Sequence, residues 1–402
     1  MHYNTVTVMQ KYEQVLRREK LNELKKRCEA LQDKKIVLVN STQHGGGVAQ
    51  ILQSIVPFLQ GIGLNITWHV IQPQPSFFQF TKKLHNGLQG QQITISKQEK
   101  QMYEANLNVA IENVPDADFY FIHDPQPAGL ATLRQMNAAL RIHIDISNPC
   151  KEALTFLKQY IQPYKELIIT HPSYLQQSIN LPHRIIEPAI DPFTDINREL
   201  TQQESKELRK KIPCEKYIAQ VSRYDPWKDP IGVIDVFERL HEHEDEYDLV
   251  LLGGDADDDP QGKKIYEKVL ERRDKSHLSH KIHVIKENNA LLVNYVQRNA
   301  DVIIQKSLRE GFGLTVSEAL YKGTPVVASR VGGIPRQIKQ DVTGYLAEPK
   351  DYDRFVKNIL AIIHSKENKK RLGKAGKQYV SKHFLLPRLA EDYVSLFEDR
   401  LL

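Results

Sequence analysis

Residues 301–329 read DVIIQKSLREGFGLTVSEALYKGTPVVAS. The apolar runs at 301–305 and 325–329 predict two strands, and the apolar spacing between them predicts a helix. The helix follows the turn Gly311-Phe312-Gly313, in which glycine allows backbone conformations that other residues avoid. A strand, a helix and a second strand in this order predict a βαβ unit of a parallel sheet.

Two carboxylates, Glu310 and Glu318, lie eight positions apart around this turn. The N–H groups of the turn can approach an anion, and a helix that begins there adds the positive end of its dipole. The carboxylates would repel a bare phosphate, but they suit the hydroxyls of sugars next to one. The segment therefore predicts a nucleotide-sugar site.

The rest of the chain extends this pattern. Strand-like runs alternate with helical stretches from Lys35 onward, which predicts parallel sheets with helices on both faces. A chain of 402 residues is long enough for two domains. We therefore expect two doubly wound, Rossmann-like α/β domains that face a central ligand cleft at the carboxyl ends of both sheets.

Four segments are expected along the chain. Residues 8–31 carry the pattern of one charged amphipathic helix, which would either pack across the domain or form a subunit contact, and the second interpretation leaves a homodimer open. The two prolines of residues 184–197 indicate a linker. The expected boundaries are a helical extension at 1–34, an N-terminal domain at 35–190, a C-terminal domain at 191–380 and a C-terminal helix at 381–402.

Composition and charge exclude several classes of protein. Hydrophobic residues make up 41% and charged residues 26% of the chain, as in an ordinary globular protein. A net charge of +5, without a basic block among aromatic residues, does not indicate a nucleic-acid partner. No apolar run approaches the roughly 18 residues that span a bilayer, and the N-terminus lacks the apolar region of a signal peptide. We therefore expect a cytoplasmic protein without an integral membrane segment.

The sequence does not indicate a metal site. Cys28, Cys150 and Cys214 lack CxxC spacing, so neither a disulfide framework nor a zinc site is expected. The acidic run at 255–259 follows two glycines and is typical of a solvated turn, and residues 241–244 lack the spacing of an HExxH site.

Two motifs in the first half of the chain follow expected strands. Gly45-Gly46-Gly47 comes after the strand at 36–40 and before a helix, so its backbone could approach a ligand. A tight turn between strand and helix explains the same glycines. His123 and Asp124 end another apolar strand, where ligands bind in open α/β sheets. A histidine satisfied within a loop is the alternative.

A third motif, RIHIDIS, is expected to form an alternating strand over 140–146 with Arg141, His143 and Asp145 on one face. A strand that is buried on both faces is usually apolar throughout. The polar face therefore indicates either a salt-bridged internal network or acceptor binding, and both interpretations stay open.

Arg223 and Lys228 lie five residues apart at a further strand end, across a turn that contains Pro226. Two cations there could clamp a diphosphate and stabilise the charge that develops as it leaves, without a metal ion. Two solvated surface cations paired with Asp225 and Asp229 are the alternative.

These motifs resemble the retaining glycosyltransferases of family 4. The likeness runs from about Val37 to Gly344 and is greatest to the branch of trehalose synthases and trehalose phosphorylases. It implies the two-domain GT-B architecture, a nucleotide-diphosphate sugar as donor, a small sugar as acceptor, no metal cofactor, and a last helix that crosses back onto the first domain. The segments that carry it are NSTQHGGGVAQIL, FIHDPQPAGL, RIHIDIS, QVSRYDPWKDPIGVID and REGFGLTVSEAL.

The resemblance also implies roles for individual residues. Arg223 and Lys228 would hold the donor diphosphate, Glu318 the ribose, and Glu310 would lie beside the donor sugar. His123 would lie near the reacting carbon and completes the expected catalytic set of His123, Arg223, Lys228 and Glu310. The other implied contacts are Gly46, Gly47, Asn289, Leu291, Gly311, Phe312, Gly313 and Leu314 on the donor side, and Asp124, Gln126 and Asp145 on the acceptor side.

The implied reaction is the transfer of glucose, with retention, from a nucleotide-diphosphate glucose to glucose, which forms trehalose. The resemblance implies attack on the same face of the sugar, in which the leaving diphosphate takes the proton of the acceptor. A double displacement would need a carboxylate nucleophile, and the loops of the first domain offer no obvious one besides Asp124 and Asp145. The alternatives are a trehalose phosphorylase, a family-4 transferase with another acceptor, and a non-catalytic nucleotide-sugar-binding protein. The presence of all four cationic and acidic donor-site residues disfavours the last.

Overall fold

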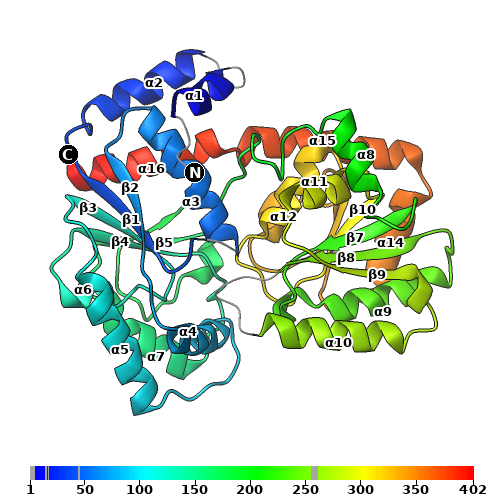
Figure 1. The fold of residues 1–402 in the computed structure, drawn as a ribbon, viewed down its shortest axis with the longest axis horizontal. Helices are drawn as coiled ribbons and strands as arrows, with labels where there is room; N and C mark the ends of the chain where they lie inside the picture. The colour runs from blue at the N-terminus through cyan, green and yellow to red at the C-terminus, as the bar shows by residue number, and fades with distance from the viewer. Residues whose placement is uncertain (1–4, 14–15, 17, 44–45, 255–260) are drawn as a thin grey trace. The chain divides into compact units, whose positions relative to one another are not determined.

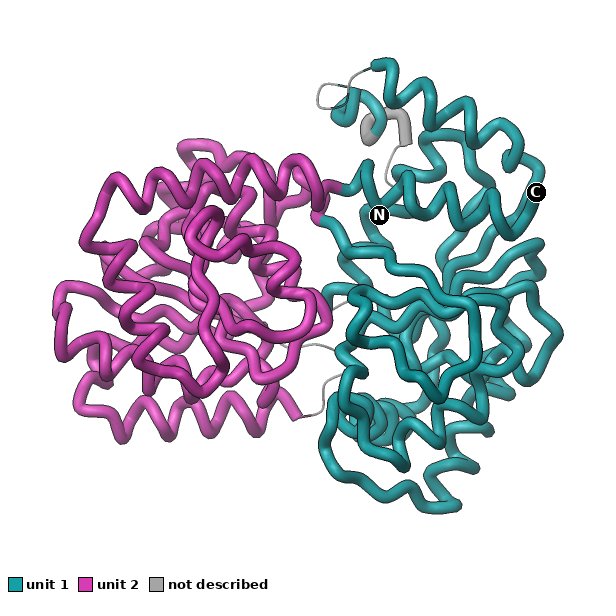
Figure 2. Tube along the Cα trace, turned by 180° about the vertical axis from the view of Figure 1, so that it is seen from behind, with its two compact units in different colours: residues 1–189, 257–260, 386–402 teal, residues 190–256, 261–385 magenta. Residues whose placement is uncertain are grey.

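The computed structural model describes residues 5–13, 16, 18–43, 46–254 and 261–402. The chain forms two compact units, each built around its own parallel sheet (Figure 2). Unit 1 comprises Met1–Ala189 and Leu386–Leu402, and unit 2 comprises Ile190–Ala256 and Gln261–Leu385.

Unit 1 contains a six-stranded parallel sheet in the order β2-β1-β3-β4-β5-β6 (Figure 1). Its strands are β1 (Ile36–Asn40), β2 (Ile66–Val70), β3 (Phe119–His123), β4 (Ala138–Ile142), β5 (Glu166–Ile169) and β6 (His183–Ile185). Its helices are α1 (Thr5–Glu13), α2 (Arg18–Glu29), α3 (Gly46–Gly61), α4 (Pro75–Leu88), α5 (Lys97–Ile111), α6 (Leu130–Leu133), α7 (Lys151–Ile161) and α16 (Leu386–Leu401).

Helices cover both faces of this sheet because the side chains of its central strands are mostly apolar. Every residue of β1, β3, β4 and β5 is buried, as a parallel sheet between two helical layers requires. On one face the ring of Phe121 in β3 meets that of Tyr393 in α16, with centroids 5.1 Å apart. The last helix of the chain is thus part of the core of unit 1.

Unit 2 contains a second six-stranded parallel sheet in the order β12-β11-β10-β7-β8-β9. Its strands are β7 (Tyr217–Val221), β8 (Asp248–Gly253), β9 (Ile282–Lys286), β10 (Val302–Gln305), β11 (Val326–Ser329) and β12 (Tyr345–Ala347). Its helices are α8 (Gln202–Arg209), α9 (Pro230–His241), α10 (Gly262–Asp274), α11 (Ala290–Asn299), α12 (Leu314–Lys322), α13 (Ile334–Gln337), α14 (Tyr352–Ile363) and α15 (Lys366–His383).

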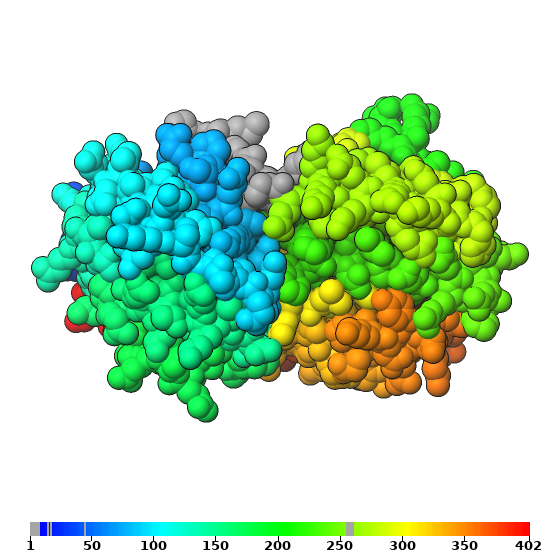
Figure 3. All heavy atoms as spheres, turned by 90° about the horizontal axis from the view of Figure 1, so that it is seen from below, coloured from blue at the N-terminus to red at the C-terminus, as the bar shows by residue number. Residues whose placement is uncertain are grey.

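Two separate apolar clusters cover the faces of the second sheet. Along β8, Val250 belongs to the cluster that contains α11 and α12, and its neighbours Leu249 and Leu251 belong to the cluster that contains α9 and α14. This alternation follows from the period of two in a strand. Helices α9 and α10, in green, and α14, in orange, form part of the surface of unit 2 seen in Figure 3.

The prediction of one helix over residues 8–31 is wrong, because two helices cover this segment. Helix α1 ends at Glu13 and α2 begins at Arg18. The two helices pack on different partners: Tyr12 of α1 meets Phe58 of α3, with ring centroids 4.7 Å apart, whereas Arg27 of α2 pairs with a glutamate of α16. The segment therefore forms two helices that pack on different partners, although its charged pattern is continuous.

The predicted strand at 140–146 is also wrong in extent, because β4 ends at Ile142. His143 and Asp145 therefore lie beyond the strand and not on one of its faces with Arg141. Two short strands, β6 and β12, escaped the sequence analysis, since three residues are too few to show an apolar period.

Candidate active site

The order of strands in unit 2 selects one position for a ligand. The chain places β8 and β9 on one side of β7 and β10, β11 and β12 on the other, so the connections diverge between β7 and β10. Ligands of open α/β sheets bind at the carboxyl ends of the strands at such a switch point. The loop after β7 carries Arg223 and Lys228, and the loop after β10 carries Glu310.

Lys228 and Glu310 form an ion pair at this switch point. Lys228 Nζ donates to Glu310 Oε2, and the two side chains are only 20% and 9% exposed. Gln305 Nε2 and Ser307 Oγ also donate to Oε2, over 3.3 Å and 3.2 Å. The sequence pattern gave no sign that Gln305 and Ser307 support the glutamate. The ammonium group is therefore held in place by a carboxylate that is itself fixed.

Asp229, next to Lys228 in the loop after β7, pairs with a different lysine. Asp229 adopts a positive φ of 48°, and its Oδ1 accepts a hydrogen bond of 3.1 Å from Gly232 N at the start of α9. Its Oδ2 pairs with Lys306, which is completely buried. Lys228 therefore pairs with Glu310 and not with the adjacent aspartate, which disfavours the interpretation of solvated surface pairs.

The Gly-Phe-Gly turn begins α12 directly after Glu310. Gly313 has a φ of 83°, and a Cβ atom there would lie 3.2 Å from Glu310 Cγ. The ring of Phe312 is buried against Phe384, with centroids 5.5 Å apart, and its carbonyl accepts from Gln337 Nε2. Anchoring of the phenyl ring fixes the course of the backbone from Gly311 to Leu314, the first residue of α12.

Glu318 lies one turn into α12 and is only 4% exposed. Gln297 Nε2 donates to Glu318 Oε2 over 3.0 Å, and Lys322 Nζ donates to the carbonyl of Glu318 over 3.2 Å. Burial lowers the pKa of Lys322 to about 7, although the nearby Glu318 carboxylate acts in the opposite direction. Neither partner was predicted from the sequence, although Lys322 lies at the i+4 spacing that brings side chains together on a helix.

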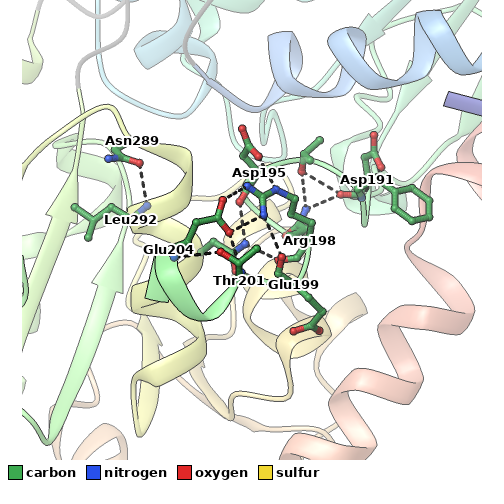
Figure 4. Close-up of polar contacts among 12 residues, drawn as sticks. Asp191, Asp195, Arg198, Glu199, Thr201, Glu204, Asn289 and Leu292 are labelled. Atoms are coloured by element: carbon green, nitrogen blue, oxygen red, sulfur yellow. Dashed lines mark hydrogen bonds and ion pairs between the residues drawn. The ribbon is translucent and has the colours of Figure 1, made fainter. Parts of the chain in front are cut away.

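Asn289 caps the N-terminus of α11, the helix that follows the edge strand β9. Its Oδ1 accepts from Leu292 N over 3.0 Å at the start of α11 (Figure 4), and its Nδ2 donates to Glu287 Oε1 over 2.8 Å. Both ends of the amide therefore support the helix terminus. Leu291, in the first turn, is half-buried against the apolar cluster of unit 2. Figure 4 also shows Arg198, in the segment before α8, with its partners Asp195 of the same segment and Glu204 of α8.

Unit 1 has its own switch point, between β1 and β3. The loop after β1 leads to Gly46 and Gly47 at the start of α3; both are exposed, and Gly46 has a φ of 76°. His44 and Gly45 lie outside the described residues, as does the acidic run at 255–259. His123 is the last residue of β3, directly before the loop that follows that strand.

His123 is 1% exposed and faces a second histidine. Its Nδ1 lies 2.9 Å from His143 Nε2, and the two rings are stacked with centroids 5.2 Å apart. Burial, with Arg141 nearby, holds the pKa of both imidazoles well below the ordinary value, so both rings are neutral. In the described part of the chain, His123 Nε2 has no hydrogen-bond partner. A neutral ring with one unoccupied nitrogen is suited to binding a hydroxyl group.

The residues next to His123 have different environments. Asp124 has a φ of 71°, and its Oδ1 accepts from His143 N over 2.8 Å. Asp145 is buried, with Oδ1 accepting from Ser147 N over 2.9 Å. Gln126 is buried, and within the described residues its Oε1 has no partner.

Arg141 does not join these groups in a salt-bridged network. Its guanidinium is completely buried and donates to Tyr393 Oη over 2.6 Å and to the carbonyl of Ile186 over 3.0 Å. It thus ties β4 to α16. The structure separates the three polar residues of the RIHIDIS motif: the arginine supports the fold, and His143 supports His123.

Within the described ranges, Cys214, Asp248 and His283 form the group of His, Cys, Asp and Glu residues whose ligand atoms could share a metal ion, all within 4.8 Å of one another. Asp248 already bonds His283 over 2.7 Å and pairs with Lys281. Asp248 and His283 lie at the amino ends of β8 and β9, whereas the loops that carry Lys228 and Glu310 follow the carboxyl ends of their strands. This cluster therefore belongs to a different part of unit 2 from the candidate site.

Comparison with known proteins places the chain in a family. The model of the trehalose synthase N-terminal domain matches residues 38–176, and that of glycosyl transferases group 1 matches residues 202–379. The trehalose synthase of Pyrococcus horikoshii is 36% identical over 96% of this chain and 95% of its own length. The chain belongs to the glycosyltransferase family that contains this trehalose synthase. The trehalose synthase of Rubrobacter xylanophilus is also 36% identical, over 96% and 95% of the two chains.

Other members and solved structures extend the likeness. The trehalose phosphorylase of Grifola frondosa is 29% identical over 90% of this chain but only 56% of its own length. A sucrose-phosphate synthase from Thermosynechococcus elongatus has a TM-score of 0.74 at 16% identity, covering 91% of this chain and 98% of that one. A trehalose-6-phosphate synthase has a TM-score of 0.71 at 14% identity, covering 90% and 99%. At such identities the likeness shows the fold, which is GT-B.

These findings confirm the predicted family, the α/β fold with two parallel sheets and the enzyme class, a glycosyltransferase that acts on sugars. Among the helices that the structure describes, none has the length and apolar character needed to cross a membrane.

Proposed function

We propose that the protein is a retaining glycosyltransferase that transfers glucose from a nucleotide-diphosphate glucose to glucose and forms trehalose. Identity of 36% to trehalose synthases, over nearly the full length of both chains, supports trehalose as the product. The observation that carries the proposal is the ion pair of Lys228 and Glu310 at the switch point of unit 2. A fixed cation at that position suits a diphosphate leaving group.

In the proposed reaction the acceptor hydroxyl attacks C1 of the donor glucose as the bond from C1 to the diphosphate oxygen breaks. The acceptor proton passes to the leaving diphosphate, so the products are trehalose and a nucleoside diphosphate. Both events occur on one face of the sugar, and the anomeric configuration is retained. The contribution of the protein is to fix positions and to stabilise the charge on the leaving group.

The donor contacts are proposed for unit 2. Lys228 and Arg223 neutralise the diphosphate, and Glu310 keeps the Lys228 ammonium in position until the donor binds. Glu318 binds the ribose hydroxyls, and the backbone of Gly311 to Leu314 contacts the sugar and phosphates, with Asn289 and Leu291 beside the base. Gly46 and Gly47 of unit 1 are proposed as further donor contacts.

The sugar contacts are proposed for the loops of unit 1 that follow β3 and β4. His123 binds a hydroxyl of the transferred glucose through its Nε2 atom. Asp124, Gln126 and Asp145 bind the acceptor. Because both histidines of the pair are held neutral, His123 serves as a hydrogen-bonding partner and not as a charged acid.

The two protein cations make a metal ion unnecessary in this proposal, because together they offset the charge of the leaving diphosphate. Turnover should therefore be the same before and after dialysis against EDTA. A loss of activity that Mg²⁺ or Mn²⁺ restores would contradict this part of the proposal.

We also propose a cytoplasmic location.

The proposal is tested by incubating the protein with UDP-, ADP- or GDP-glucose and glucose, and measuring trehalose and nucleoside diphosphate. We expect both products in equal amounts with at least one donor. A trehalose phosphorylase is the competing function, since the Grifola frondosa enzyme is also related. Release of glucose 1-phosphate from trehalose and inorganic phosphate, without transfer from any of the three donors, would favour that function.

A further inference from the structure

Glu318 lies in a continuous chain of polar groups, in which Gln297 and Asn197 are also buried and Lys322 is half-buried. Gln297 of α11 is completely buried, and its Nε2 donates to Glu318 Oε2 over 3.0 Å. Lys322, one turn later on α12, donates to Gln297 Oε1 over 2.8 Å and to Asn197 Oδ1 over 2.9 Å. The order of contacts is therefore ammonium, amide and carboxylate.

The charges at the two ends fix the orientation of the amide. An amide rotated by half a turn would point its NH₂ group at the Lys322 ammonium and its oxygen at the Glu318 carboxylate, and both contacts would be repulsive. The backbone of Gln297 is held as well, because Thr324 Oγ1 donates to its carbonyl over 2.6 Å. The Gln297 amide therefore keeps a single orientation, with its NH₂ group toward Glu318 and its oxygen toward Lys322.

The ammonium of Lys322 is matched by its surroundings. A protonated lysine offers three donors, and Lys322 has three acceptors: Asn197 Oδ1, Gln297 Oε1 and the carbonyl of Glu318. The charged groups that face it are Glu318, Arg298 and Glu199. A neutral amine would have only two donors for these three acceptors, so the contact pattern fits the protonated form.

We propose that Gln297 and Lys322 are positioning residues that hold the Glu318 carboxylate in the orientation that accepts the ribose hydroxyls of the donor. This proposal rests on the proposed function, in which Glu318 is the ribose ligand. Gln297 and Lys322 act on the donor only through that carboxylate. A side chain that is ordered before the ligand arrives loses less entropy on binding, so affinity for the ribose rises.

The test compares a nucleoside diphosphate with its 2′,3′-dideoxy form, which lacks the ribose hydroxyls. The probe is whichever of UDP, ADP and GDP the wild-type protein binds most tightly by isothermal titration calorimetry. Hydrogen bonds to a carboxylate are strong, so the wild-type protein should bind the dideoxy form roughly tenfold more weakly or worse. In Gln297→Leu, that ratio should fall to about threefold or less, because the carboxylate loses its orientation.

Each result has a distinct meaning. Equal binding of the two nucleotides by the wild-type protein would refute the ribose role of Glu318, and with it this inference. A wild-type preference that Gln297→Leu retains in full would refute the inference alone. Lys322→Met is the second variant: it keeps the Gln297 amide but removes the ammonium that fixes it, and it should reduce the ratio too. If both variants keep the wild-type ratio, the network has only a structural role.

A matched control separates positioning from loss of stability. Asn358 is another buried amide of unit 2; it donates to the carbonyl of Leu346, away from the candidate site. Asn358→Leu should lower the melting temperature without a change in the ratio of the two affinities. The same change of ratio in Asn358→Leu would show that general destabilisation is the cause.

Discussion

Replacement of Lys228 by alanine removes the charge that we assign to the leaving diphosphate. Loss of one preorganised group at developing charge lowers kcat by about 10²- to 10³-fold, or about 2.7–4 kcal/mol. The Lys228 side chain is 20% exposed, so water can enter the vacated place, and Arg223 remains as a second cation. We therefore expect a loss of roughly several hundred-fold, within that range.

The same change also affects stability. It leaves Glu310, 9% exposed at its side chain, without its lysine, although Gln305 and Ser307 still donate to the carboxylate. A buried charge that loses its partner lowers the free energy of unfolding, here by about 1–3 kcal/mol. Removing Glu310 as well, in Lys228→Ala/Glu310→Ala, should restore part of the lost stability but none of the lost turnover.

The assay is the initial rate of nucleoside diphosphate release at saturating donor and acceptor, together with the unfolding midpoint in urea. Lys275→Ala is the control, because Lys275 pairs with Glu271 at the surface of the same unit with both side chains more than half exposed. That variant should keep kcat within about twofold, as expected for an exposed pair. A kcat of Lys228→Ala near the wild-type value would refute the role of Lys228 and the reasoning from the ion pair.

Three further outcomes are expected. The free energy of unfolding should fall as pH decreases below about 6.5, because histidines then bind protons in the unfolded chain while the buried His123 and His143 stay neutral in the folded protein. Urea titrations at several pH values measure this fall, and it should be shallower in His143→Leu. Gly313→Ala should lower stability by about 1–2 kcal/mol and raise the KM for the donor, whereas Gly262→Ala, where the new methyl would meet only an ordinary contact at 3.8 Å, should change neither. Nucleotide affinity should decrease as pH rises above about 7, where Lys322 loses its proton and one of its three donors, and Lys322→Met should bind with no pH dependence in this range.

The sequence was sufficient for the repeating architecture, because continuous apolar strands and glycine turns are local signals. The strand before Gly311 and the helix after it are both present where the pattern places them. The two switch points could not be derived in the same way, since strand order depends on contacts between distant segments. They explain why the loops after β1, β3, β7 and β10 carry the candidate residues.

The sequence was less informative about what each polar residue contacts. The spacing of Arg141 and His143 suggested one polar face, but β4 ends between them, and the arginine bonds Tyr393, 252 positions away in the chain. Gln297 had no signal at all, because a lone glutamine in a helix is ordinary at the surface. Its burial and its charged neighbours appear only after α11 and α12 pack together.

The stereochemistry of transfer tests the proposed reaction most directly. The protein is incubated with nucleotide-diphosphate α-glucose and glucose labelled with ¹³C at C1, and the product is followed by NMR from the first turnovers. We expect a single non-reducing disaccharide in which both anomeric carbons are α, with one nucleoside diphosphate released for each molecule formed. A β linkage at the transferred sugar, or nucleotide release without a disaccharide, would contradict the proposed reaction.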